Sequence, residues 1–104
     1  MLKFQEKNLK IFLAIISLMP QISTFLGIII RMFYRDHNPP HFHAAYAEYE
    51  GLIDINKLEL LWGSLPPRVL GLVIEWAALH RSELMDNWER AKRQETIQPI
   101  APLV

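Results

Sequence analysis

Residues 25–50 read FLGIIIRMFYRDHNPPHFHAAYAEYE, two apolar segments on either side of a proline pair. Residues 25–35 are rich in β-branched and aromatic side chains, which strands favour. Pro39 and Pro40 cannot donate a hydrogen bond to a β-ladder, and each holds the residue before it extended. The stretch therefore predicts a first strand over residues 25–35, a rigid loop, and a second strand over residues 41–50.

Because side chains alternate along a strand, the pattern also predicts which of them face the core. The first strand has one wholly apolar face, predicted to be buried: Leu26, Ile28, Ile30, Met32 and Tyr34. Its other face carries Arg31, Phe33 and Arg35. On the second strand the same alternation places His41 and His43 side by side, opposite Phe42 and Tyr46.

The rest of the chain predicts more strands and then helix. Gly51 permits a bend or bulge before residues 52–55, and Asn56 with Lys57 suits a turn into a strand over residues 58–62. Ser64 is a favourable N-cap for a helix that starts near Leu65 and extends to about residue 94. One helix and two helices meeting near Ser82 both fit the apolar spacing. Strands that precede helices predict an α+β domain.

The expected architecture is a three- or four-stranded antiparallel sheet, with one long or two consecutive helices packed across one face. Trp76 and Trp88 lie on the apolar stripe of the helical region, so both are predicted to pack against the sheet. Beyond Thr96 the tail contains Pro99 and Pro102 and is predicted to be extended.

Composition limits the class of protein. A chain of 104 residues with 51% hydrophobic content suits one globular domain. Basic and acidic residues number 11 each, so no overall field attracts nucleic acid or an anionic membrane. Acidic residues dominate residues 44–61, where Lys57 is the only lysine or arginine. The absence of cysteine excludes disulfides and thiolate chemistry and suits a reducing, cytoplasmic location.

Residues 1–18 form a segment of their own, in which three lysines precede an apolar run over residues 11–19. The run resembles a signal peptide, but it falls far short of the roughly 20 residues that span a bilayer, and no small-residue cleavage site follows it. We expect residues 1–18 to be an extension outside a single domain of residues 19–104, and we expect no membrane partner.

Three of the four histidines lie in the segment Asp36-His37-Asn38-Pro39-Pro40-His41-Phe42-His43. Imidazole is the commonest ligand of late transition metals, so one hypothesis is a divalent metal site, zinc being the simplest case. Its predicted ligands are Asp36, His37, His41 and His43, and Glu75 or His80 are candidates to approach from the helix. The alternative is a structural turn in which backbone carbonyls satisfy the histidines.

Two further hypotheses involve nucleic acid. His41 and His43 are candidates for a catalytic acid and base that cleave RNA without metal, with nearby arginines countering the phosphate charge. Alternatively, the sheet face and adjoining loop stack bases and hold phosphates, and the predicted binding residues are Arg31, Phe33, Arg35 and Asn38. Arg90, Lys92 and Arg93 at the helix end would assist, although cations are also favourable there for the helix dipole.

The chain resembles a widespread family of small bacterial proteins of unknown function over residues 19–103. The segments that carry the resemblance are MPQIS (19–23), DHNPPHFHA (36–44), GSLP (63–66), EWAALHR (75–81) and NW (87–88). The resemblance implies two-gene arrangements reminiscent of toxin–antitoxin pairs and assigns no reaction. We therefore expect an interaction protein that acts with a small protein partner, and a metal-dependent hydrolase or nuclease is the alternative.

Overall fold

A computed structural model describes residues 19–104 of the chain, so the expectations for residues 1–18 lie outside the described residues. Five strands precede two helices. Their bounds are β1 Gln21–Phe25, β2 Ile28–Arg31, β3 His41–Tyr46, β4 Tyr49–Asp54, β5 Leu60–Ser64, α2 Pro67–Leu79 and α3 Arg81–Lys92. In residues 19–104 no helix combines the length and the apolar character needed to cross a membrane.

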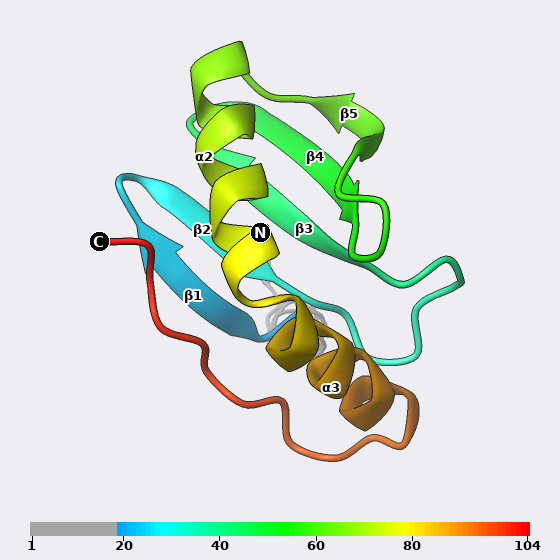
Figure 1. Cartoon of the computed structure of the whole chain (residues 1–104). Helices are drawn as coiled ribbons and strands as arrows, with labels where there is room; N and C mark the ends of the chain where they lie inside the picture. The colour runs from blue at the N-terminus through cyan, green and yellow to red at the C-terminus, as the bar shows by residue number, and fades with distance from the viewer. Residues whose placement is uncertain (1–18) are drawn as a thin grey trace, which may run out of the picture.

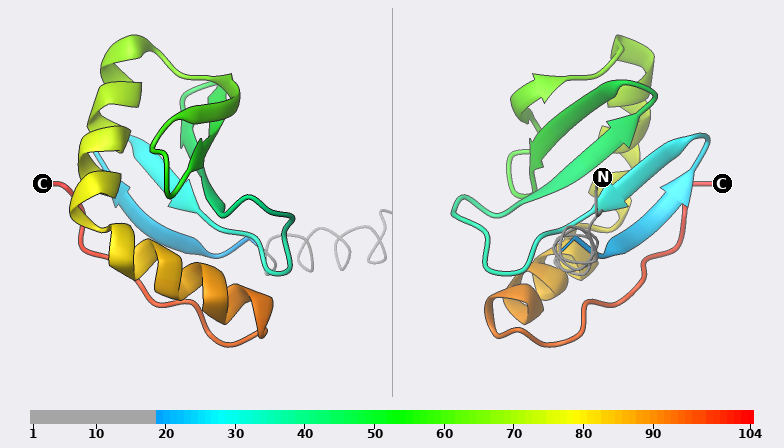
Figure 2. Two further views of the ribbon diagram at one scale, coloured as in Figure 1. Left: turned by 45° about the vertical axis from the view of Figure 1, so that its right-hand side comes forward. Right: turned by 180° about the vertical axis from the view of Figure 1, so that it is seen from behind.

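The strands form one antiparallel sheet in the order β1-β2-β3-β4-β5, in which each strand pairs with its neighbours along the chain. Helix α2 crosses one face of the sheet, α3 continues past its end, and the C-terminal tail returns alongside β1 (Figure 1). No helix of residues 19–104 crosses the other face (Figure 2), although Trp88 of α3 reaches His41 at the end of the sheet. The predicted α+β class is confirmed, with five strands where three or four were expected.

The predicted strand over residues 25–35 is wrong at both ends. Leu26 and Gly27 form the turn between β1 and β2, with φ of 51° and 80°. Positive φ at both central residues is the geometry of a tight hairpin turn, which asparagine or aspartate before glycine usually signals and leucine does not. Leu26 is therefore 56% exposed, whereas Ile28 and Ile30 are fully buried as predicted.

The predicted second strand also divides, because a turn at Ala47, with φ of 52°, separates β3 from β4. Gly51 lies within β4, and the β4–β5 register shifts just after it, between Leu52 and Ile53. A Cβ at Gly51 would come within 2.8 Å of the Leu60 side chain, so close packing explains the glycine. Ser64 ends β5 and caps no helix, since the N-cap residue of α2 is Pro66.

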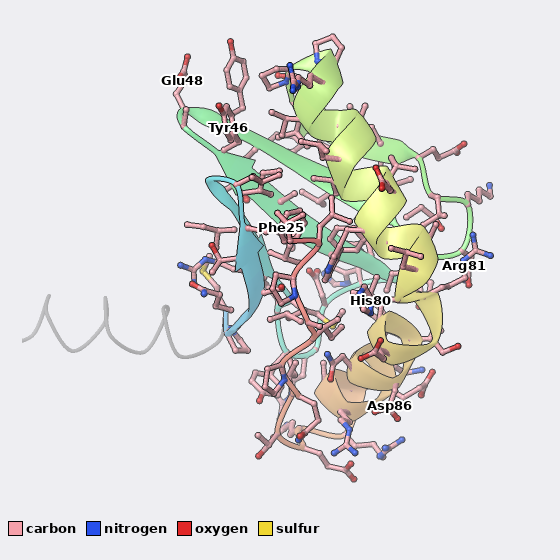
Figure 3. The ribbon with its side chains drawn as sticks, turned by 60° about the vertical axis from the view of Figure 1, so that its left-hand side comes forward. Phe25, Tyr46, Glu48, His80, Arg81 and Asp86 are labelled. Atoms are coloured by element: carbon pink, nitrogen blue, oxygen red, sulfur yellow. The ribbon has the colours of Figure 1, made fainter. Side chains whose placement is uncertain are left out.

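The helical region consists of two helices that meet at His80, two residues before the expected junction (Figure 3). Trp76 of α2 is completely buried, with its ring 5.5 Å from that of Phe25 and 5.8 Å from that of Phe42. Trp88 of α3 is 2% exposed, so the predicted packing of both tryptophans is confirmed.

Hydrogen bonds hold the extended tail against the rest of the domain. The Trp76 Nε1–H donates to the Ala101 carbonyl at 2.8 Å. The buried Asn87 side chain donates to the Gln98 carbonyl and accepts from the Gln98 N–H, both at 2.8 Å. The Ile100 N–H donates to the Ile22 carbonyl of β1 at 3.0 Å, so the tail also covers the outer edge of β1.

Two glycines should respond to the same substitution with opposite signs. A Cβ at Gly63, where φ is +83°, would lie 2.2 Å from the Glu50 carbonyl oxygen, whereas one at Gly71 in α2 meets nothing within 4 Å. We expect Gly63→Ala to lower the free energy of unfolding by roughly 1–3 kcal/mol. Gly71→Ala should raise it by about 0.5–1 kcal/mol. Urea denaturation measures both, and equal effects would contradict the strain assigned to Gly63.

Candidate metal centre on the open sheet face

Strand β3 presents its histidines on the sheet face that α2 leaves open. Phe42 contacts Trp76 on the helix side, so the alternating His41 and His43 lie on the opposite side. Their ring centroids are 5.4 Å apart. The predicted proximity of the two histidines is thus confirmed.

The loop between β2 and β3 brings Asp36 to these two rings. The Asp36 Oδ1 accepts the backbone N–H of His37 at 2.8 Å, which fixes the carboxylate. The Asp36 Oδ2 then lies 3.0 Å from the His41 Nε2 and 3.4 Å from the His43 Nε2. A single carboxylate oxygen therefore faces both Nε2 atoms.

The other nitrogen of each ring also faces an acceptor. The His41 Nδ1 lies 2.8 Å from the Pro39 carbonyl oxygen, and the His43 Nδ1 lies 3.4 Å from the Glu50 Oε2. A carbonyl oxygen only accepts, so the His41 Nδ1 carries a proton and donates it. In a neutral His41 the Nε2 lone pair then points at a carboxylate oxygen, an arrangement that a shared proton or a metal cation stabilises.

The cluster is largely shielded from solvent but still reachable. The side chains of His41, His43 and Asp36 are 6%, 12% and 19% exposed. The His41 ring packs beside Trp88 at 5.3 Å, and Phe33 stacks on His43 at 4.2 Å with 7° between the planes. These contacts fix the orientation of both imidazole rings.

The electrostatics of the cluster favour an ionised carboxylate. Burial acts to raise the pKa of Asp36, but the backbone N–H of His37 and the facing imidazoles of His43 and His41 outweigh it. The pKa of Asp36 is consequently lowered from its ordinary value. The Asp36 carboxylate therefore remains charged and able to act as a ligand.

Three of the four predicted metal ligands come together. Within residues 19–104, Asp36, His41 and His43 offer ligand atoms that all lie within 4.8 Å of one another. His37 is exposed and contributes its backbone N–H to Asp36, so its predicted role as a ligand gains no support from the geometry. Neither helix residue joins the cluster, since Glu75 is exposed and His80 pairs with Glu83.

Two of the four predicted nucleic-acid residues lie beside His43, and the other two lie on the loop. Arg31 is the Cα partner of His43 on β2, and its Nη1 donates to the Met19 carbonyl at 2.9 Å. Phe33 is occupied in stacking on His43, whereas Arg35 and Asn38 are exposed on the loop. The helix-end cations face carboxylates within their own segment: Arg90 with Asp86, Lys92 with Glu89, and Arg93 with Glu95.

Glu50 is a member of the cluster that the sequence analysis did not identify. It lies on β4, where Ala45 is its Cα partner on β3, and its side chain reaches the Nδ1 of His43. The signal that would have revealed it is the turn at Ala47, since a hairpin there places Glu50 beside β3. Without that turn, residues 41–50 form one strand and Glu50 lies far from His43.

Residues 27–89 match the family described as Domain of unknown function (DUF4160). The chain belongs to this family. The DUF4160 match includes the histidine segment of residues 36–44 and is shorter than the span of residues 19–103 over which the resemblance was drawn. No curated protein and no solved structure matches the chain.

Proposed function

We propose that the chain binds one divalent transition-metal ion through Asp36, His41 and His43 and uses it for hydrolysis. The observation that carries the proposal is the convergence of two Nε2 atoms on one carboxylate oxygen, while the Nδ1 atoms face acceptors. A cation at the point of convergence would accept lone pairs from all three groups at once. Two histidines and one carboxylate form a ligand set used by zinc and by non-haem iron.

The distances support this ligand set. Metal–ligand bonds of about 2.1 Å imply ligand–ligand separations of roughly 3.0 Å in octahedral and 3.4 Å in tetrahedral coordination. The separations from the Asp36 Oδ2 to the His41 and His43 Nε2 atoms are 3.0 Å and 3.4 Å. Two of the three ligand–ligand separations therefore already match those around a bound ion, and all three ligand atoms lie within 4.8 Å of one another.

The groups around the ligands support the same proposal. A metal-bound histidine usually donates its other ring N–H to a carbonyl or a carboxylate, which fixes the tautomer and makes the ring a better ligand. Pro39 provides such a carbonyl for His41, and Glu50 such a carboxylate for His43. If the two histidines only stabilised the loop, any hydrogen-bond acceptors would serve their ring nitrogens. Nothing would then require both Nε2 atoms to face the same carboxylate.

Three protein ligands leave a coordination position for water, as in hydrolytic zinc enzymes. A bound ion there would lower the pKa of that water and polarise the scissile bond. The metal-free alternative needs both rings to exchange protons with substrate, but His41 is 6% exposed with both nitrogens facing protein groups. The geometry therefore favours the metal-dependent reaction over catalysis by the histidine pair alone.

We propose a phosphodiester as the substrate. Arg31 is the Cα partner of His43 on β2; its Nη1 donates to the Met19 carbonyl, and its other N–H groups could counter charge on a phosphate. Arg35 and Asn38 on the exposed loop add polar groups near the cluster. These residues are the reason to place a nuclease or phosphodiesterase ahead of a peptidase.

We expect untagged protein to bind about one equivalent of zinc, or of cobalt(II) used as a spectroscopic substitute. His43→Ala should abolish binding because it removes one of three ligands. His37→Ala and His80→Ala are matched controls, since they remove the histidines outside the cluster, and both should bind as wild type does. Equilibrium dialysis with metal analysis measures the stoichiometry, and the visible spectrum of cobalt reports its coordination.

Two outcomes would overturn the metal proposal. One is wild-type protein that retains no zinc, cobalt, manganese, nickel or iron(II) after incubation with each ion. The other is equal binding by wild type and His43→Ala, because the ion would then bind elsewhere. If metal binding were lost in His37→Ala but not in His43→Ala, the ligand would be His37 and not His43.

The role of Glu50 gives a second measurement. We expect Glu50→Ala to weaken zinc binding by about 10–100-fold while keeping the stoichiometry, because His43 loses the acceptor for its Nδ1–H. Glu48→Ala is the matched control, because it removes the same charge at the β3–β4 turn (Figure 3). Competition with a chelator of known affinity measures both. If both variants lost the same zinc affinity, the loss would reflect the change in net charge and would contradict a specific role for Glu50 as the acceptor of the His43 Nδ1–H.

The hydrolytic activity has its own test. We expect zinc- or manganese-loaded protein to cleave RNA or an activated phosphodiester, and His43→Ala to reduce the rate to that of the free ion. His37→Ala should retain the rate, and Arg31→Ala should raise KM because a countercharge for the phosphate is lost. A metal-loaded protein that cleaves none of these substrates would leave metal binding intact and reject hydrolysis.

We also propose a small protein partner, of the kind found in toxin–antitoxin-like modules, as a second candidate function. It is supported by Leu61 and Trp62, neighbouring residues of β5 that are 41% and 64% exposed. An exposed tryptophan together with an exposed leucine on an edge strand favours contact with another molecule. This proposal does not depend on the metal.

A further inference from the structure

The two edges of the sheet differ in how they are covered. At the β1 edge, the Ile100 N–H of the tail donates to the Ile22 carbonyl. At the β5 edge, β4 pairs with one side of the strand, and no other strand of residues 19–104 pairs with the other side. The open β5 edge therefore presents backbone groups that can pair with a further strand.

Strand β5 lacks the charges and prolines that protect many exposed edges, although its pairing with β4 shifts register between Leu52 and Ile53. Edge strands commonly carry lysine, proline or inward-pointing charges that prevent pairing with other chains. The sequence of β5 is Leu-Leu-Trp-Gly-Ser, with no charge and no proline. Trp62 is 64% exposed, whereas the other two tryptophans, Trp76 and Trp88, are 0% and 2% exposed. An apolar, uncharged edge beside an exposed tryptophan favours occupation by a strand of another molecule.

The charges around the β5 edge define what kind of strand it would accept. Glu59 directly precedes β5 and is exposed, and Glu50 is the Cα partner of Ser64 at the other end of the strand. Glu48 lies nearby in the β3–β4 turn, and Lys57 is the only base in residues 44–61. An incoming strand with lysine or arginine would meet the exposed carboxylate of Glu59 at one end. At the other end Glu50 lies one strand inward, with its side chain beside His43.

We propose that β5 accepts an extended, basic segment of a partner protein as a sixth strand, with Trp62 as its apolar anchor. Main-chain hydrogen bonds would supply affinity, and the carboxylates would select for basic side chains. The inference rests on the proposed small protein partner and specifies where and how that partner binds. It does not rest on the metal site.

A second copy of the chain fits the edge less well. Antiparallel self-pairing places the start of one β5 beside the end of the other. Glu59 of one copy would then approach Ser64 of the other, whose neighbour on β4 is Glu50. Like charges would gather at both ends of the joined strands, which disfavours this arrangement. A basic partner removes the repulsion.

The probe is a fluorescent, end-blocked peptide of strand length that alternates lysine with valine, and its binding is followed by anisotropy. We expect the full-length protein to bind it at least ten-fold more tightly than the same peptide with glutamate in place of lysine. Methylation of the peptide's backbone amides should abolish binding, because it removes the strand hydrogen bonds. Trp62→Ser should weaken binding at least ten-fold.

Leu79→Ser is the matched control variant, because Leu79 is 68% exposed on α2 and lies away from the edge. It should bind the lysine peptide as wild type does, with circular dichroism confirming that both variants fold. The proposal is overturned by equal binding of the two peptides, by binding that survives methylation or Trp62→Ser, or by no binding of the lysine peptide. A dimer in sedimentation that Trp62→Ser dissociates would assign the edge to a second copy.

Co-purification from the protein's own cells separates failure of the edge from failure of the partner. If a small protein co-purifies equally with wild type and with Trp62→Ser, the proposal of a protein partner stands, and β5 is rejected as its binding site. If the lysine peptide binds as expected and the co-purifying protein is lost in Trp62→Ser alone, both the protein partner and its site on β5 are supported. Absence of any co-purifying protein rejects the partner function whatever the peptide does.

Discussion

The burial of Trp76 is the interaction on which the arrangement of the domain depends. Its ring contacts Phe25 of β1 and Phe42 of β3, so one side chain of α2 joins strands from two parts of the sheet. Its Nε1–H is bonded to the Ala101 carbonyl, which also positions the tail. Because Phe42 points to the sheet face that α2 covers, the residues that alternate with it along β3 point to the opposite face. Burial of the apolar face thereby places His41 and His43 where the Asp36 loop can reach them.

Much of the fold was predictable, because the signals that succeeded are local. Alternation assigned Ile28, Ile30 and Phe42 to the core, and apolar spacing assigned Trp76 and Trp88 to the helix–sheet contact. The failures are turns formed by residues that rarely form them. Leu26 and Ala47 adopt positive φ although both carry a Cβ. Gly27 suits the first of these turns, but leucine and alanine are not usual turn residues, so the pairing of the strands must impose the conformation.

The sequence indicated which residue types form the candidate site, but it identified only in part which individual residues belong to it. The density of histidine and aspartate in residues 36–43 indicated Asp36, His41 and His43, and strand alternation explains why both histidines lie on one face. His37 was included because it lies in the same segment, but a side chain on a loop has no periodicity that fixes its direction. Glu50 was missed because its position depends on how β3 and β4 pair. Contacts between strands are set by turns, and here the turn gave no signal.

The Asp36–His41–His43 cluster and the side chain of Trp62 lie on one sheet face but form separate surfaces. A row of Cα partners runs from Arg31 through His43 and Leu52 to Trp62. Neighbouring strands are about 4.8 Å apart, so β5 lies roughly 10 Å from β3, and a strand added to β5 roughly 14 Å from it. A partner's backbone at β5 therefore cannot coordinate an ion held by His41 and His43. Only a partner that continues past the added strand and folds back over Leu52 would cover the cluster. Strand addition and metal binding, as proposed, would therefore share only Glu50, and a partner that inhibits hydrolysis would have to contribute a second segment besides the strand on β5.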